Sequence, residues 1–498
     1  MFHIRTTKTS SRATAVQIVR YQNRKMIIVK HIGSAQDNNE LKELKETAVS
    51  WIEKVTKQPS LFTKESVPQV LQLKQYQYIG FRYGFVYESL YELCKRFRFH
   101  RLRNQFLIDL VIARIIEPGS KLQSLEFLKE FMGIEHRREY FYRQLPKFLS
   151  VKNSVESKVL SVARNEFDFD FSLVFYDVTT LYFESTESDE LRQCGFSKDN
   201  KFNQPQIVLG LLVSAKGFPV GYQIFEGNKF EGHTLIPIIL RFKRKHKIEK
   251  FTVVADAAMI SSENITALSS AKLQYIVGAR IANLSLNSIK AISTGLDRHD
   301  EATMRMQTEL GDLICEFSEK RYVKDKREME KYITKAEKLL KNPGSIKRAK
   351  FIKSQHQTYT LNTALIEKTS LLLGIKGYYT NLLKSEASDQ LVIDHYHNLW
   401  HVEQAFRITK SDLQIRPIYH FKEKMIEAHI LICFMALALC KYMELKTGKS
   451  TKSILKLLKG VTDARLVYTV SGKEFTLRSV VGSEVKQLLE KMAIMTQI

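Results

Sequence analysis

Cysteine is scarce in this sequence, and the cysteines that are present form no pattern. The chain has five, namely Cys94, Cys194, Cys315, Cys433 and Cys440. They are scattered, odd in number and without the paired Cys/His spacing of a zinc site. A disulfide framework and a zinc knuckle are therefore both disfavoured. We expect a reduced protein of the cytoplasm.

Long hydrophobic runs are also missing. The longest uninterrupted apolar run is Ile430–Cys440, 11 residues, whereas a membrane-spanning helix needs roughly 18. The sequence therefore predicts a buried core helix there and no membrane partner. The N-terminus carries Arg5, Lys8 and Arg12 but no apolar stretch behind them, which argues against a secretory signal.

Negative charge is the third shortage. The chain has 77 Lys and Arg against 53 Asp and Glu, so its formal net charge is +24 and its pI is near 9.6. An excess of this size favours a polyanionic partner, and nucleic acid is the commonest one. The 498 residues, of which 44 % are hydrophobic, suffice for about three domains with a large core.

The first third of the chain is expected to form a small hairpin followed by helices. Residues 15 to 32 alternate as two strands around a turn at residues 22 to 24, and a mainly helical pattern runs from 71 to 165. Within it lies the basic run CKRFRFHRLRNQF (94 to 106). This run is either a DNA contact or a solvated helix face. The candidate DNA-binding residues there are Lys95, Arg96, Arg98, Arg101 and Arg103.

From residue 171 the pattern changes to strands that alternate with helices, which predicts a mixed α/β sheet. Residues 282 to 375 break that rhythm and are interpreted as an insertion, and a helix is expected over 391 to 411. The predicted division is 1–65, a hairpin and helix; 66–165, a helical DNA-binding region; 166–281 with 376–445, the catalytic domain; 282–375, the insertion; and 446–498, a C-terminal helical region.

Two aspartates stand at positions where a carboxylate needs an explanation. Asp177 lies in the hydrophobic run VFYDVTT, and Asp256 follows the apolar strand VVA. A buried carboxylate must be paired or bind a metal, and open α/β sheets collect ligands at the carboxyl ends of their strands. A turn or a helix cap would explain either residue alone.

The predicted helix over 391 to 411 supplies a third carboxylate. It sets Glu403, Arg407 and Lys410 at offsets of four and seven residues, on one helical face. A surface helix could carry these charges for solubility. Alternatively, Glu403 joins Asp177 and Asp256 in holding hard cations such as Mg²⁺ or Mn²⁺, since all three donate oxygen.

Several motifs together resemble bacterial insertion-sequence transposases, in particular DDE transposases with a Tyr-Arg-Glu-Lys signature. The matching segments are YDVTTLYFES, VADAAMISSENI, YIVGAR and YHNLWHVEQAFRITKSDLQIRPIYH. The resemblance implies a ribonuclease H-like catalytic domain with Asp177, Asp256 and Glu403 as its acids. Tyr396, Glu403 and Lys410 match the signature, but Leu399 stands where an arginine is expected, and Arg407 is the candidate substitute.

The resemblance further implies an enzyme that cuts the ends of an insertion sequence and joins them to target DNA, using two divalent ions. Its partners would be the terminal inverted repeats and target DNA, bound by a homodimer in a bacterial, nucleoid-associated setting. Tyr396, Arg407 and Lys410 would contact DNA. Two alternatives remain open: a metal-dependent nuclease or junction resolvase without strand transfer, and a catalytically idle DNA-binding protein.

Overall fold

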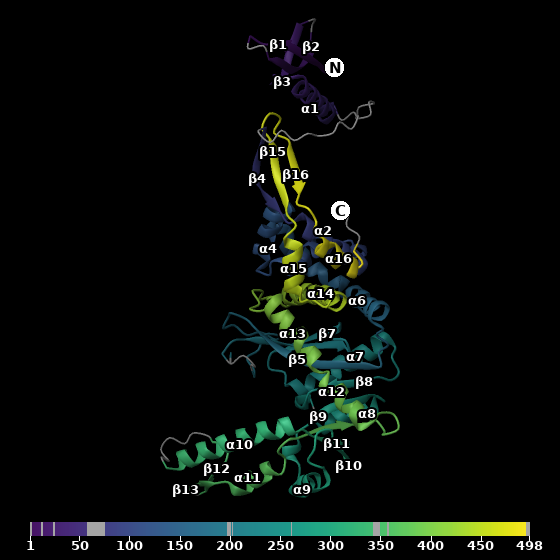
Figure 1. Cartoon of the computed structure of the whole chain (residues 1–498), viewed down its shortest axis with the longest axis vertical. Helices are drawn as coiled ribbons and strands as arrows, with labels where there is room; N and C mark the ends of the chain where they lie inside the picture. The colour runs from purple at the N-terminus through teal and green to yellow at the C-terminus, as the bar shows by residue number, and fades with distance from the viewer. Residues whose placement is uncertain are drawn as a thin grey trace.

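The molecule is elongated, with its layers stacked along one axis (Figure 1). The structure is a computed structural model that describes residues 2–10, 13–22, 25–56, 75–196, 201, 203–259, 261–341, 349–355 and 358–494. A small sheet with one helix stands at one end, a helical layer occupies the middle, and a large sheet extends toward the other end (Figure 1).

The N-terminal unit is a three-stranded antiparallel sheet covered by a helix. Its elements are β1 (Phe2–Lys8), β2 (Thr14–Gln22), β3 (Lys25–Ala35) and α1 (Asn38–Thr56). Val16 and Ile18 from β2 and Leu44 and Ala48 from α1 are buried between the two layers. The two strands predicted within residues 15 to 32 are present as β2 and β3; residues 23 and 24 of their turn lie outside the described residues.

The helical layer is built from both ends of the chain around one apolar helix. Its helices are α2 (Gly84–Arg96), α3 (Gln105–Ile116), α4 (Lys121–Phe127), α5 (Arg138–Gln144), α6 (Lys152–Phe167), α14 (Glu423–Thr447), α15 (Thr451–Lys459) and α16 (Ser483–Lys491). Within the described residues, α14 alone is long and apolar enough to span a membrane, but 89 % of that apolar window is buried inside the protein. Burial on all sides identifies α14 as the core helix that the run Ile430–Cys440 predicts.

The C-terminal region predicted to be helical holds the helices α15 and α16 but also contains strands. Residues 446–498 contain a hairpin, β15 (Asp463–Tyr468) and β16 (Glu474–Arg478), and β15 pairs with β4 (Tyr76–Arg82) in a three-stranded sheet. The hairpin is completed by a strand from the far end of the chain. Neighbouring residues in the sequence carry no sign of that pairing.

The large sheet confirms the mixed α/β prediction. Its eight strands run in the order β10-β11-β14-β9-β8-β5-β6-β7. β5, β8 and β9 are parallel to one another, and the remaining pairs are antiparallel. The bounds are β5 (Leu173–Tyr182), β6 (Gln206–Ser214), β7 (Pro219–Glu226), β8 (Thr252–Ala255), β9 (Gln274–Ala279), β10 (Thr303–Thr308), β11 (Gly311–Phe317) and β14 (Ile375–Thr380).

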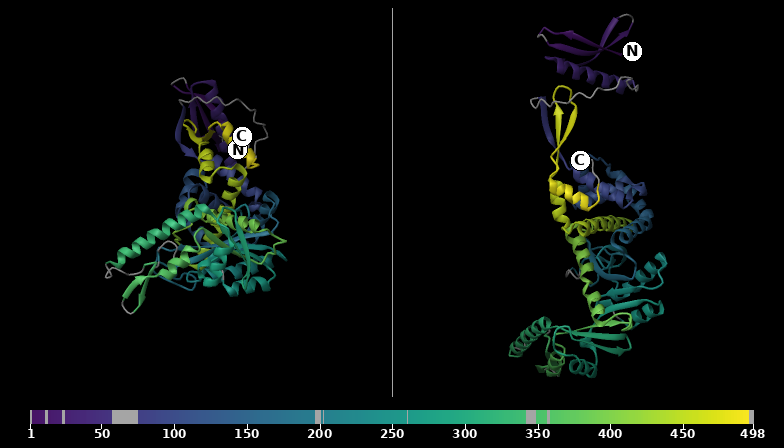
Figure 2. Two further views of the ribbon diagram at one scale, coloured as in Figure 1. Left: turned by 60° about the horizontal axis from the view of Figure 1, so that its bottom comes forward. Right: turned by 45° about the vertical axis from the view of Figure 1, so that its right-hand side comes forward.

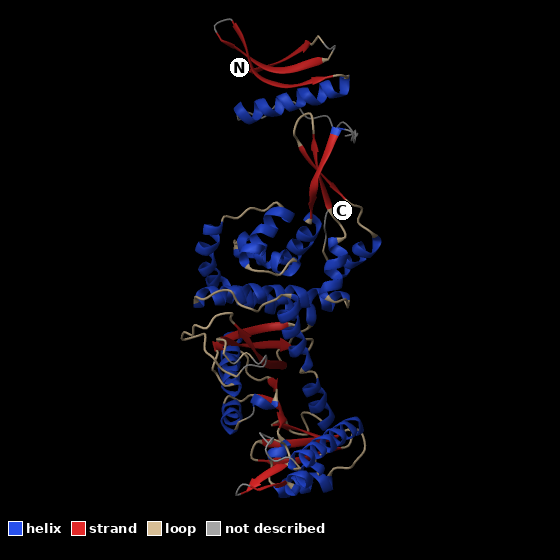
Figure 3. Cartoon of the chain, turned by 90° about the vertical axis from the view of Figure 1, so that its left-hand side faces the viewer, coloured by secondary structure: helices blue, strands red, loops and turns tan. Residues whose placement is uncertain are grey.

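Helices lie on either side of this sheet (Figure 3). They include α7 (Leu235–His246), α8 (Ser262–Ser270), α12 (Asp389–His397) and α13 (Trp400–Arg407). The single helix predicted over 391 to 411 is broken, because the chain turns at residues 398 and 399 and then passes into a π-helical turn at Ile408–Asp412. As a result α12 packs on β8, β9 and β14, whereas α13 packs on β5 and β6.

The segment interpreted as an insertion is in part integral to the large sheet. It contains α9 (Leu286–Gly295), β10, β11, α10 (Glu319–Leu340), β12 (Ile352–Gln355), β13 (Thr358–Leu361) and α11 (Thr363–Ser370). β10 and β11 extend the sheet through β14. α10 and the β12–β13 hairpin project away from it, as the left view in Figure 2 shows.

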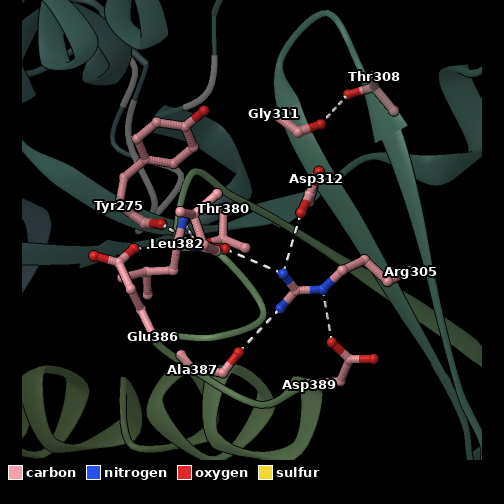
Figure 4. Close-up of polar contacts among 11 residues, drawn as sticks. Tyr275, Arg305, Thr308, Gly311, Asp312, Thr380, Leu382, Glu386, Ala387 and Asp389 are labelled. Carbon is pink, nitrogen blue, oxygen red and sulfur yellow. Dashed lines mark hydrogen bonds and ion pairs between the residues drawn. The ribbon is translucent and has the colours of Figure 1, made fainter.

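Arg305 on β10 fastens this added sheet edge to the start of α12 (Figure 4). Its guanidinium donates to Asp389 at 2.7 Å, to Asp312 at 3.1 Å, and to the carbonyl oxygens of Leu382 and Ala387. The Arg305 side chain is 11 % exposed, so these bonds are largely shielded from water. The arginine thereby fixes where α12 begins.

Candidate active site

Two parallel strands bring the two predicted aspartates next to each other. β5 and β8 pair in parallel, with Tyr176 opposite Ala255. Asp177 and Asp256 each follow one of these partners, so they are neighbours on the same face of the sheet. Asp256 stands directly after β8, at the carboxyl end of a strand, where open α/β sheets place their ligands.

Tyr396 joins Asp256 to α12, the helix that packs on this part of the sheet. Its phenol donates to the Asp256 Oδ1 at 3.1 Å, and its ring centroid lies 4.7 Å from that of Tyr378. Gly278 on β9 makes this approach possible, since a Cβ there would lie 2.4 Å from the Tyr396 hydroxyl. Tyr396 is 7 % exposed, so its hydroxyl is held against Asp256 and little of its side chain is open to a DNA strand.

The third acid reaches the same place from α13. Glu403 is exposed on that helix. Burial raises the pKa of the Tyr396 phenol, and the charge of Asp256 raises it further. The charges of Asp177 and Glu403 act on the same pKa in the same direction, so the negative charges of all three acids reach this tyrosine.

These acids do not form a closed coordination group in this structure. Among the described residues, no cluster of three or more Asp, Glu, His or Cys side chains stands at metal-binding separation. The donor chemistry nevertheless fits Mg²⁺ or Mn²⁺, because the three groups supply only carboxylate oxygens. Asp256 and Glu403 are exposed, so an ion can reach their carboxylates from solvent.

Lys376 is a site residue that the sequence analysis missed. It lies on β14 with its Nζ 4.6 Å from the ring centroid of Tyr396 and 5.2 Å from that of Tyr378, a cation–π distance. Burial lowers the pKa of Lys376, and Arg321 lowers it further. The carboxylates of Asp256 and Glu403 oppose that change. A half-buried cation therefore faces the acids.

Glu316 also belongs to this face of the sheet, although it comes from the predicted insertion. It pairs with Lys376 across β11 and β14. The Tyr378 hydroxyl donates to its carboxylate, and His397 Nε2 lies 3.2 Å from the same oxygen. In the sequence, only a lone charge within each apolar strand, in LICEF and in GIKGYYT, points to Glu316 and Lys376.

The structure separates the predicted phosphate-binding residues of the signature helix. Arg407 is exposed at the last residue of α13, but Lys410 lies in the following π-helical turn. The offset of seven residues therefore does not place Lys410 on the face that carries Glu403 and Arg407. Leu399, at the position where the Tyr-Arg-Glu-Lys signature would have arginine, is buried in the turn between the two helices.

The five residues predicted from the basic run have different roles in the structure. Arg96 donates to Glu166 at 2.5 Å and lies over the ring of Tyr442, which makes it part of the helical layer. Lys95 pairs with Glu92 at 2.6 Å. Arg96 is thus held within the protein, whereas the Lys95 side chain is 45 % exposed despite its ion pair.

The other three arginines of the run form an outward basic surface. Arg98 and Arg103 flank a short 3₁₀ turn at Phe99–Leu102 with positive φ, and these two and Arg101 are all exposed. Burial lowers the pKa of Lys158 on α6, and Arg101 and Arg98 lower it further. Crowded like charges of this kind are suited to a polyanion.

Comparison with known proteins places this site in a family. The family described as "Transposase DDE domain" matches residues 168–439, a range that contains all three acids. No curated protein matches the chain. A solved structure, titled "Cryo-EM structure of piggyBac transposase synaptic complex with hairpin DNA (SNHP)", is similar at 10 % identity and a TM-score of 0.35, covering 60 % of this chain and 56 % of that one. The chain thus spans little more than half of that protein. On the strength of the family match over more than half of its length, the chain belongs to the transposases with a DDE domain.

Proposed function

We propose that this chain is the transposase of a bacterial insertion sequence, of the group with the Tyr-Arg-Glu-Lys signature. It cuts the ends of the element and joins them to target DNA. The observation that carries this proposal is the meeting of Asp177 and Asp256 on neighbouring parallel strands, with Glu403 acting on the same tyrosine. The strand order β7-β6-β5-β8-β9 supports a ribonuclease H-like core.

Asp177, Asp256 and Glu403 are proposed to hold two divalent ions, Mg²⁺ or Mn²⁺. When bound, such ions offset the charge that builds up on a phosphodiester during displacement. Tyr396 keeps the Asp256 carboxylate turned toward the site through its hydrogen bond. In cleavage, water forms a bond to phosphorus while the bond to the 3′ oxygen breaks. In joining, that 3′-hydroxyl forms a bond to a target phosphorus while the bond from this phosphorus to the target's own 3′ oxygen breaks, and the target leaves with a free 3′-hydroxyl.

Cationic side chains are proposed to meet the phosphate. Because Leu399 cannot donate a hydrogen bond, we assign the missing arginine contact to Arg407, which is exposed one turn beyond Glu403, and to Lys376, which faces the acids. Lys410 contributes from the next turn. Their positive charge would stabilise the crowded phosphate during transfer.

Double-stranded DNA is the proposed partner, in the form of terminal repeats and of target. The charge of +24 supplies affinity that should fall steeply with salt. Arg98, Arg101 and Arg103 are proposed to contact DNA within a mainly helical N-terminal region. Because both ends of the element are cut together, the protein is proposed to act as a homodimer on DNA. Its proposed location is the bacterial nucleoid.

The test is a joining assay on duplexes that carry the inverted repeats flanking the coding region, with Mg²⁺ or Mn²⁺ and a target plasmid. We expect cleavage and strand transfer from the wild type and a loss of at least about a hundredfold in Asp256→Asn. Glu263→Gln, which removes an exposed carboxylate on nearby α8, is the matched control. Cleavage without joining would identify a nuclease, and wild-type activity in Asp256→Asn would reject the acid assignment.

A further inference from the structure

A cavity of about 290 Å³ lies away from the three acids, between the end of α3, the start of α4, the loop after α13 and α14. Gln414 and Tyr419 at its rim are exposed, so the cavity can be reached from solvent. Of the described residues that line it, none is Asp or Glu. Its basic residues are Arg114, Lys121, Arg416, His420 and His429.

Two of these basic groups are buried without a carboxylate. Lys121 is 5 % exposed and Arg114 is 2 % exposed. Lys121 Nζ donates to His429 Nδ1 at 3.0 Å, and His429 Nε2 donates to the Ile415 carbonyl at 2.9 Å. This imidazole is thus a neutral acceptor for the ammonium group.

Arg114 is incompletely satisfied. Its Nη1 reaches the carbonyl oxygens of Leu413 and Gln414 only at 3.4 and 3.5 Å, and its Nε is buried with no hydrogen-bond partner. Burying a cation without a counter-charge destabilises a fold by several kcal/mol. The buried Arg114 therefore lowers the stability of the fold unless a bound anion supplies the missing counter-charge.

The positively charged groups that line the cavity repel one another. Burial lowers the pKa of Lys121 well below its usual value, and Arg114 lowers it further. Burial lowers the pKa of His420 to about 4, with Lys121 and Arg114 adding to the effect. A bound anion would offset these repulsions, which gives the cavity a reason to select negative charge.

We propose that this cavity is a binding site for a phosphate group. Its donors come from four segments of the chain and surround the space, an arrangement suited to a tetrahedral oxyanion with several acceptor oxygens. A single carboxylate would offset less of this positive charge. Arg416 adds a guanidinium at the rim, stacked 5.5 Å from the ring of Tyr182.

The position of the cavity suggests where the phosphate comes from. Ile418 donates its backbone N–H to the Tyr182 carbonyl at 3.3 Å, so the cavity loop lies beside the last residue of β5. Tyr182 is five residues beyond Asp177, about 17 Å along an extended strand. If the proposed function holds, a DNA strand leaving the acids passes the cavity and offers a backbone phosphate; free phosphate is the other source.

The first experiment follows thermal unfolding of the full-length protein with increasing inorganic phosphate at constant ionic strength. We expect the Tm of the wild type to rise with phosphate. Lys121→Met keeps the side-chain volume and removes the buried cation, so it should raise the Tm without phosphate and weaken phosphate binding about tenfold or more. His420→Gln is a second variant with the same expected loss of binding. Lys422→Met, which removes an exposed lysine from the same stretch of chain, should respond to phosphate as the wild type does.

A second experiment adds a short DNA duplex and distinguishes the two sources. Competition between duplex and phosphate in the wild type, with weaker duplex binding by Lys121→Met than by Lys422→Met, assigns the site to a DNA phosphate. Phosphate binding that the duplex does not disturb assigns it to free phosphate. If Lys121→Met and His420→Gln bind both phosphate and the duplex as strongly as Lys422→Met does, the site does not exist. None of these readouts requires cleavage, so the result is independent of the acid assignment.

Discussion

The Tyr396 hydroxyl donates a hydrogen bond of 3.1 Å to the Asp256 carboxylate, and this bond joins the signature helix α12 to the end of strand β8. Tyr396 is buried and fixed by Tyr378 and Gly278. Under the proposed function, Tyr396 would therefore be a positioning residue for Asp256, the second acid.

Tyr396→Phe tests that role. The ring remains and only the hydrogen bond is lost, so we expect an unchanged Tm and a fall in DNA cleavage of about 10- to 100-fold, as for other groups that orient ligands. Cleavage should recover in part at higher Mn²⁺ concentration, because the carboxylate is still present. Tyr78→Phe, an exposed tyrosine on β4, is the control. Unchanged activity in Tyr396→Phe would show that Asp256 needs no orientation.

Gly278→Ala should have a larger effect on the same contact. The new Cβ would lie 2.4 Å from the Tyr396 hydroxyl and 3.0 Å from its Cζ, so the ring must move away from Asp256. We expect cleavage to fall more than in Tyr396→Phe. In the double variant Gly278→Ala/Tyr396→Phe the worst contact is absent, so the two losses should be less than additive. Additive losses would place the effect of Gly278 elsewhere.

Much of the sheet and the two aspartates could be predicted from the sequence, because local patterns carry them. β5 and β8 are apolar runs interrupted or ended by one carboxylate, and strand ends meet at one edge of a parallel pair. The burial of Tyr396 could not be predicted, since it depends on Gly278 and Tyr378 from two other strands. The sequence signature alone predicted a DNA contact for Tyr396.

The missed features share a physical cause. β4 pairs with β15 although the two strands are far apart in the sequence, and Lys376 faces Glu316 only because β14 pairs with β11. Such contacts depend on strand partners that are distant in sequence. The break between α12 and α13 was also missed, because residues 391–411 have good helical periodicity on either side of it.

Lys376→Met tests the missed cation. Removing the charge that faces Asp256 and Glu403 should lower cleavage by about a hundredfold, while the Tm stays equal or rises because a half-buried charge is lost. Lys353→Met, on the projecting β12, removes the same charge from an exposed position and should leave cleavage unchanged. Equal activity of the two variants would remove Lys376 from the site.

Arg305→Leu should destabilise the large sheet. It leaves Asp389 and Asp312 without their guanidinium partner in a largely buried setting, so we expect a loss of about 2–4 kcal/mol in the free energy of unfolding. Urea unfolding measures it. Arg327→Leu on exposed α10 should cost less than about 0.5 kcal/mol. A similar small cost for Arg305→Leu would mean that β10 does not anchor α12.

Acid should destabilise the protein through His420. Because its pKa in the folded protein is about 4, below the usual value of 6.5, the unfolded chain binds more protons between these two pH values. Stability therefore falls as the pH drops through that window and is fully present above it.

The loss attributable to this group is at most about 3 kcal/mol. In His420→Gln the stability measured by urea unfolding should fall less between pH 7 and about 4, whereas His299→Gln, at an exposed position, should keep the wild-type slope. Saturating phosphate should also reduce the dependence of wild-type stability on pH, because an anion in the cavity favours the protonated imidazole. If neither His420→Gln nor phosphate alters this pH dependence, the cavity charges do not interact as the structure indicates.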